Sequence, residues 1–132
     1  MSKLYGYLID SSVLYLPLQH QVISNRGEVC HLRKTMGELL DYLMQNADKG
    51  IVTDDDIIFS VWERNNLSGS YSRLWQVMRG LKSKLEKVGI QRELFIRARG
   101  QGYYLVPARV IPLYTKNKTN IKVQKKNSID MS

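Results

Sequence analysis

The spacing of apolar residues changes twice along the chain, and these changes constrain the fold more than any other feature. Residues 3–32 contain short apolar runs broken by residues that favour turns, a pattern typical of strands. From Thr35 the apolar residues recur every three or four positions, and near Leu94 the strand pattern returns. The sequence therefore predicts an α+β fold, with a short N-terminal antiparallel sheet, a helical middle and a C-terminal β-hairpin.

The middle of the chain predicts three helices. The first covers about residues 36–46, and Thr35 has the spacing of a capping-box residue at its start. The second helix is shorter and follows Thr53, which has the same spacing. The third covers residues 71–88. Their apolar faces consist of Met36, Leu39, Leu40, Leu43 and Met44, then Ile57, Ile58, Val61 and Trp62, then Leu74, Met78, Leu81, Leu85 and Val88.

The last quarter of the chain predicts a hairpin and a tail. Residues 94–106 have the pattern of two strands around a Gly-Gln-Gly turn. Pro107 and Pro112 are expected to end the ordered structure. The polar, basic segment from Lys116 predicts a flexible tail.

The whole chain has a formal net charge of +8, and its positive charge is concentrated in the second half. Residues 1–63 carry five basic and nine acidic residues, a net of −4, whereas residues 64–110 carry ten and two, a net of +8. This distribution favours a polyanionic partner. No apolar run approaches the roughly eighteen residues that span a bilayer. A single cysteine, Cys30, and the lack of a signal segment predict a cytoplasmic location.

The third predicted helix carries DNA-binding side-chain types opposite its apolar stripe. At about 100° per residue, Gln76 and Arg79 lie on this outward face between basic flanks. Gln and Arg bond base edges in the major groove, and flanking charges neutralise phosphates. Gly80 would let the helix approach the bases closely, at a cost of about 1 kcal/mol. In the hairpin, Arg97 and Arg99 are expected on one side, where they suit a narrow minor groove.

The order of these elements is that of a winged helix-turn-helix, and four motifs between residues 32 and 106 make the resemblance specific. They are L-x-x-T-x-x-E-L-L-x-Y-L, V-T-D-D-D-I-x-x-x-V-W, M-R-G-L-K-S-K-L and I-R-A-R-G-Q-G-Y-Y-L. Together they resemble the DNA-binding domain of OmpR/PhoB-type bacterial regulators. We accordingly expect an N-terminal sheet subdomain over residues 1–31, a winged helix-turn-helix over 32–107, and a basic tail or linker over 108–132.

The resemblance implies a transcription regulator that binds double-stranded promoter DNA. It also implies that the regulator activates transcription and that two copies can bind as a tandem dimer. It implies that the loop over residues 63–70 faces RNA polymerase or a neighbouring subunit. Because no receiver domain precedes the motifs, the chain is similar to the ToxR/CadC-like branch, in which a longer protein adds a membrane tether or works with a co-regulator. The implied residues are Ser72, Arg73, Gln76, Arg79, Gly80, Lys82 and Ser83 on the recognition helix, Arg97, Arg99 and Gln101 on the wing, and Arg64, Asn65 and Asn66 in the loop.

The chain departs from this family at two of the implied positions. The family usually has a second basic residue where Gly80 stands, and often a threonine where Arg97 stands. The base preference of a relative therefore does not transfer to this chain.

Several alternatives remain open from the sequence. The basic helix could be an ordinary solvated helix, the winged helix could be a protein-protein interaction module without specific DNA binding, and the tail could hold the protein at a membrane surface. The run Asp54-Asp55-Asp56 fits a helix N-terminus better than a metal site. Trp62 is expected in the core, and for Trp75 packing is favoured over contact with a sugar or a thymine methyl group. We identify no catalytic grouping and expect no metal, no cofactor and no enzyme activity.

Overall fold

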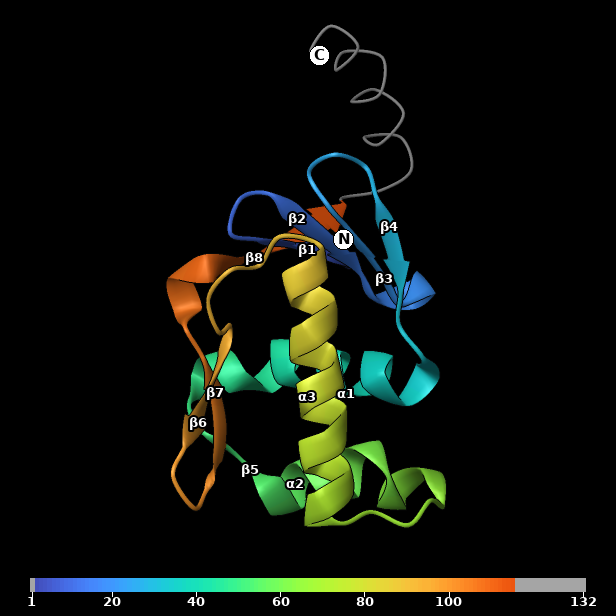
Figure 1. Ribbon diagram of the computed structural model, residues 1–132, viewed down its shortest axis with the longest axis vertical. Helices are drawn as coiled ribbons and strands as arrows, with labels where there is room; N and C mark the ends of the chain where they lie inside the picture. The colour runs from blue at the N-terminus through green and yellow to red at the C-terminus, as the bar shows by residue number, and fades with distance from the viewer. Residues whose placement is uncertain (1, 116–132) are drawn as a thin grey trace, which may run out of the picture.

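The computed structural model describes residues 2–115, which form a sheet, three α-helices and a smaller sheet (Figure 1). The larger sheet has five antiparallel strands in the order β4-β3-β2-β1-β8. These strands are β1 Lys3–Ile9, β2 Val13–Leu16, β3 Gln21–Ile23, β4 Val29–His31 and β8 Val110–Thr115. The four strands expected within residues 3–32 are confirmed, because β1 to β4 form successive antiparallel pairs.

The fifth strand, β8, corrects the expectation that order ends at Pro107 and Pro112. Strand β8 pairs with β1 along its whole length, from Lys3 opposite Thr115 to Ile9 opposite Val110. Pro112 is tolerated because β8 is an edge strand, where a missing N–H can face away from the sheet. The predicted tail therefore cannot begin at residue 108, and its part from Lys116 lies outside the described residues.

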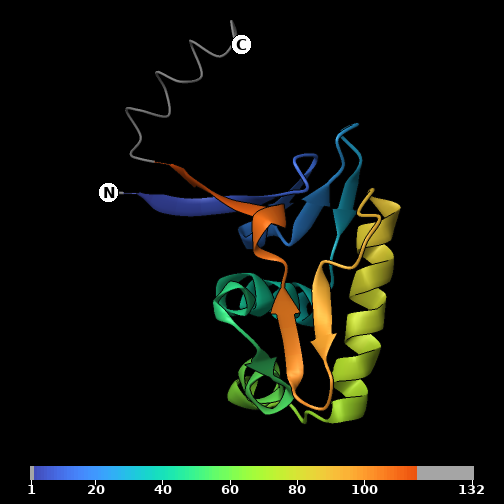
Figure 2. The ribbon, with the colours of Figure 1, turned by 90° about the vertical axis from the view of Figure 1, so that its left-hand side faces the viewer.

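The three α-helices lie on one side of the five-stranded sheet, with α1 near the sheet and α2 farthest from it (Figure 2). They are α1 Lys34–Asn46, α2 Asp54–Val61 and α3 Tyr71–Lys87. The predicted helices are confirmed. Helix α1 begins slightly earlier than predicted, and α2 begins directly after Thr53, as its predicted cap requires. Helix α3 runs from α2 at its N-terminal end to the large sheet at its C-terminal end (Figures 1 and 2).

The caps of α1 and α2 differ from each other. The Thr53 hydroxyl accepts a hydrogen bond from the backbone N–H of Asp56 at 3.1 Å, which confirms the cap predicted for α2. The capping box predicted at Thr35 is wrong, because Arg33 is the N-cap residue and its side chain makes no capping bond. The carbonyl of Arg33 already accepts the N–H of Gly37 at 2.8 Å, so Thr35 lies inside the helix.

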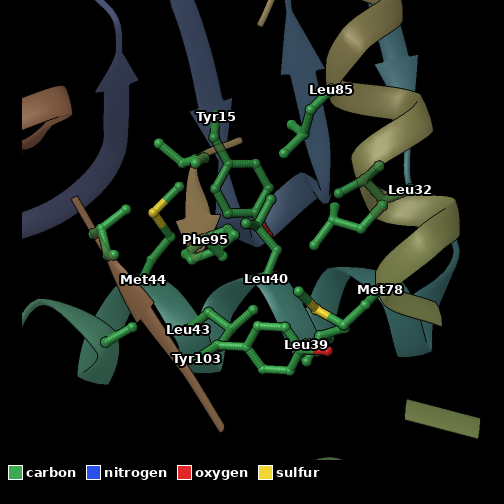
Figure 3. Packing of buried hydrophobic residues seen from close by; sticks show 14 of the residues in the cluster. Tyr15, Leu32, Leu39, Leu40, Leu43, Met44, Met78, Leu85, Phe95 and Tyr103 are labelled. Atoms are coloured by element: carbon green, nitrogen blue, oxygen red, sulfur yellow. The ribbon is translucent and has the colours of Figure 1, made fainter. Parts of the chain in front are cut away.

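The core lies between the large sheet and the helices (Figure 3). The apolar stripes predicted for the three helices supply most of its helical part, and Trp62 is confirmed as a core residue with 2% of its surface exposed. The sheet contributes Tyr15, whose hydroxyl donates to the carboxylate of Asp41 on α1. His20 approaches the same carboxylate at 3.2 Å. These polar contacts fix the sheet to the first helix.

The second sheet contains the predicted hairpin. Strands β6 Phe95–Ala98 and β7 Gly102–Leu105 form the hairpin, and the two-residue strand β5 Val52–Thr53 pairs with β7, in the order β5-β7-β6. Tyr103 is 9% exposed and Tyr104 is 38% exposed, so one of these neighbouring tyrosines is buried and the other is on the surface. No helix within residues 2–115 is long and apolar enough to cross a membrane.

Two glycines give the hairpin its shape. Gly100 has φ = +70°, a left-handed conformation that a glycine adopts without strain. Gly102 lies so close to β5 that an added Cβ would be 1.8 Å from the carbonyl oxygen of Val52. The first glycine allows the turn, and the second allows β7 to lie against β5.

Candidate nucleic-acid interface

Helix α3 presents one buried face and one exposed face. The Ser70 hydroxyl caps the helix by accepting the backbone N–H of Arg73 at 3.1 Å. The predicted stripe of Leu74, Met78, Leu81 and Leu85 is buried. The opposite face is therefore free to contact a ligand along the length of the helix.

The structure places the sequence-predicted residues of α3 in two groups. Lys82 and Gly80 are half-buried, and Lys82 forms an ion pair with Glu93. A Cβ added to Gly80 would be 2.9 Å from the methyl group of Met36, so the missing side chain leaves room for α1. The exposed residues, which share the outward side of the helix, are Ser72, Arg73, Gln76, Arg79 and Ser83.

Trp75 is a surface residue, and the expectation that its ring is packed away beneath the wing is wrong. Its side chain is 56% exposed, and the guanidinium carbon of Arg79 lies 4.8 Å from the centre of its ring. One step around the helix from Leu74 places Trp75 at the border of the buried stripe, where the wing does not cover it. The exposed aromatic ring and the cation above it form a cation–π pair next to the predicted DNA-binding face.

A cleft of about 380 Å³ separates α3 from the wing, which is the β6–β7 hairpin. Its apolar lining includes Leu74, Met78 and Phe95. Its charged lining consists of Arg79, Lys82 and Arg97 together with Asp54 and Glu93. Lys82 is paired with Glu93 and Arg97 with Asp54, so Arg79 is the cation of this cleft without an ion pair among the described residues.

The tip of the wing exposes Arg99 and Gln101, whereas Arg97 is engaged in an ion pair. The Arg97 guanidinium donates two hydrogen bonds to the Asp54 carboxylate, at 2.6 and 2.9 Å. This hydrogen bonding raises the pKa of Arg97 further above its ordinary value. Sequence reasoning predicted that Arg97 and Arg99 project alike, but it could not foresee a partner 43 residues away.

A second groove contains basic residues that the sequence reasoning missed. It lies between the start of α1 and α3, has a volume of about 500 Å³, and is lined by Arg33, Lys34, Arg73 and Gln76 among others. Arg33 and Lys34 are exposed. The signal in the sequence that could have found them is the pair of adjacent basic residues just before the predicted start of the first helix at residue 36.

The loop between α2 and α3 is exposed over residues 63–68. It begins with the short 3-10 helix Glu63–Asn65, and Asn66 follows in a left-handed conformation with φ = +61°. Arg64, Asn65 and Asn66 are all on the surface. Leu67 and Phe59 add exposed apolar area beside them, at 48% and 56% exposure.

This arrangement, with a helix presenting polar and basic residues beside a β-hairpin, is that of a winged helix DNA-binding domain. The family described as "Transcriptional regulatory protein, C terminal" matches residues 27–105. The chain belongs to this family and is a DNA-binding transcription regulator domain of OmpR/PhoB type, a non-enzymatic class.

Solved structures share the fold. The DNA-binding domain of E. coli CadC is 19% identical with a TM-score of 0.70, over 86% of this chain and 100% of that one. The DNA-binding domain of CpxR from E. coli is 19% identical with a TM-score of 0.57, over 74% and 91%. The Klebsiella pneumoniae RstA DNA-binding domain in complex with the RstA box is 19% identical with a TM-score of 0.56, over 73% and 92%. The comparison with curated proteins gave no match.

Proposed function

We propose that this protein binds specific sites in double-stranded DNA, with α3 in the major groove and the tip of the wing in the adjacent minor groove. The observation that supports this most is that exposed Arg79 and Trp75 line the α3–wing cleft while exposed Gln76 lines the groove between α1 and α3. A sequence-neutral polyanion site would need only the charges. Gln76 and Arg79 add the donors and acceptors that distinguish bases.

The proposed roles follow from exposure and chemistry. Gln76 and Arg79 contact base edges, with Ser72 and Ser83 as shorter hydrogen-bonding neighbours. Trp75 packs against sugar or thymine methyl groups while it supports the Arg79 guanidinium. The residues assigned to phosphates are Arg33, Lys34, Arg73 and Lys82, the last after exchange of its partner Glu93.

The wing contributes its tip to the minor groove. Arg99 is the inserted cation, and Gln101 hydrogen-bonds beside it. Gly80 keeps the place between α3 and α1 open for Met36. Its role is thus to set how closely α1 and its basic start lie to the recognition helix, rather than to contact a base.

We propose that the bound protein activates transcription. The exposed loop at Arg64, Asn65 and Asn66, with Phe59 and Leu67 nearby, offers polar and apolar contacts for RNA polymerase or for a second copy bound in tandem. We place the domain in the bacterial cytoplasm. Residues from 116 onward are proposed to serve as a basic linker, which would lead to a membrane tether if the natural protein is longer.

The test is selection from a random duplex library at two salt concentrations, followed by affinity measurement on the selected site. Replacing Arg79 and Arg99 by alanine should abolish enrichment, because both are assigned to the grooves. Replacing Arg33 or Arg73 should instead lower the slope of log K against log salt, by about 0.9 for each lost phosphate contact. The matched control replaces Lys3 and Arg26, exposed residues of β1 and the β3–β4 turn, which removes the same charge from the large sheet rather than from α3 or the wing. It should retain enrichment.

Weak binding without enrichment, equal in both double variants, would refute specific recognition. The winged helix would then be a protein-protein interaction module whose basic half attracts any polyanion. Strong enrichment in the control but not in the Arg79, Arg99 variant would establish both the surface and the operator.

A further inference from the structure

The three aspartates at the start of α2 make three different contacts. The Asp54 carboxylate pairs with Arg97 of the wing. The Asp55 carboxylate accepts the hydroxyl of Tyr71, the first residue of α3, at 2.6 Å. Asp56 uses its backbone N–H to bond the Thr53 cap, and its carboxylate makes no hydrogen bond or ion pair within residues 2–115. The first turn of α2 therefore touches both elements that are proposed to contact DNA.

The contact with the wing is the more constrained of the two. Arg97 and Asp54 meet through two parallel hydrogen bonds, and 15% of the Asp54 side chain is exposed. The Arg97 guanidinium carbon also lies 4.9 Å from the centre of the Tyr103 ring, directly across the hairpin. A two-bond contact fixes direction as well as distance, which a single bond does not.

The backbone reinforces this contact. The N–H of Asp54 donates to the carbonyl of Gln101 at 2.9 Å, and Thr53 pairs with Gly102. One residue, Asp54, thus holds the wing through its backbone at the turn and through its side chain at β6. Because Asp55 holds Tyr71 at the same helix turn, the position of the wing is set relative to α3.

We propose that the Asp54–Arg97 pair is a latch that fixes the wing at the separation from α3 that DNA binding requires, so that both residues are positioning residues and Arg97 is not a phosphate contact. The proposal rests on the proposed function. For Asp54, simple electrostatics predicts the opposite effect on DNA binding. A carboxylate beside a DNA-binding surface repels phosphates, so its removal alone should strengthen binding. The latch predicts that its removal weakens binding.

The experiment compares Asp54→Asn, Arg97→Gln and their combination on a duplex selected by the wild-type protein. With the latch, each single variant binds about threefold to tenfold more weakly, as coupling between contacting residues allows. The slope against salt stays unchanged, and the double variant is no weaker than either single one. Asp56→Asn is the matched control, since it removes the same charge from the same helix turn and leaves the latch intact. It should bind as tightly as wild type or more tightly.

Footprints on the same duplex separate a displaced wing from a damaged domain. Asp54→Asn should lose hydroxyl-radical protection in the minor groove that the wing contacts, while protection of guanine N7 in the major groove persists. Equal or tighter binding by Asp54→Asn would overturn the proposal. So would a salt slope lowered by about one in Arg97→Gln alone, because that is the mark of a phosphate contact.

Amide hydrogen exchange of the free protein tests the latch independently of DNA binding. Asp54→Asn should speed amide hydrogen exchange over residues 95–105, and Asp56→Asn should not. If the wild-type protein selects no duplex, the proposed function fails, and this exchange result alone decides whether the latch holds the wing. If exchange is unchanged in Asp54→Asn, the latch is refuted even when the protein binds DNA.

Discussion

Replacing Gly102 by alanine tests whether the wing depends on close contact between two backbones. An added Cβ would be 1.8 Å from the Val52 carbonyl oxygen, 2.7 Å from the Val52 carbonyl carbon and 2.8 Å from the Cα of Thr53. All three atoms belong to the backbone of β5, so no side-chain rotation relieves the overlap. The strands β5 and β7 must move apart.

The size of the effect follows from the displacement. An ordinary contact begins at 3.4 Å, so the strands must separate by about 1.6 Å. The hydrogen bond from the Asp54 N–H to the Gln101 carbonyl is 2.9 Å long and would not survive that shift. Each hydrogen bond is worth about 1 kcal/mol, and overpacking costs a further 1–3 kcal/mol, so the free energy of unfolding should fall by about 2–4 kcal/mol.

Urea unfolding measures this loss, and Gly100→Ala is the matched control. Gly100 has open space around it and φ = +70°, so alanine there brings only backbone strain of about 1 kcal/mol. Both substitutions reduce the entropy of the unfolded chain alike, so the difference between them reports the steric clash. If Gly102→Ala unfolds within about 0.5 kcal/mol of Gly100→Ala, the tight contact with β5 does not exist.

Three further outcomes are expected. Trp75→Ala should weaken binding to the selected duplex about tenfold by gel shift and change the free energy of unfolding by less than about 0.5 kcal/mol, since the ring is 56% exposed. Arg109→Ala should cost about 3 kcal/mol in urea unfolding, because Arg109 bonds Asp10 and two backbone carbonyls. Arg109 also lowers the pKa of Asp10 below its ordinary 3.8, so the stabilisation is present above that pH and is lost as the pH falls through the native pKa. Asp10→Asn should lack this acid-dependent loss in unfolding measured between about pH 5 and 2.

The parts of the fold that were predictable are those with a local, repeated signal. The stripe of Leu74, Met78 and Leu81 located α3 because the apolar side of a helix recurs at a fixed interval. The glycines around Gln101 located the hairpin because few residues adopt its turn. The motifs then indicated the family, which the match to residues 27–105 confirms.

What could not be predicted depends on contacts between distant residues. Strand β8 was missed because an edge strand tolerates Pro112, and its partner β1 is at the other end of the described chain. The exposure of Trp75 depends on where the wing lies, which no local pattern gives. The alternating pattern of the strand indicates which side of the hairpin Arg97 faces. It does not indicate that Asp54 lies on that side and forms an ion pair with it. The DNA-contacting roles themselves stay predictions until a duplex is bound.

The pairing of β8 with β1 has a consequence for how the chain is made. The Thr115 hydroxyl bonds the carbonyl of Lys3 across 112 positions, so the large sheet joins the first and last described strands. During synthesis, β1 leaves the ribosome with one edge open, and that edge stays unpaired until almost all of the described residues have emerged. Pairings over such distances close slowly because the intervening loop must first lose its entropy. The recognition helix can therefore form before the sheet is complete, and the closing of β1 by β8 is the step that we expect to limit the folding rate.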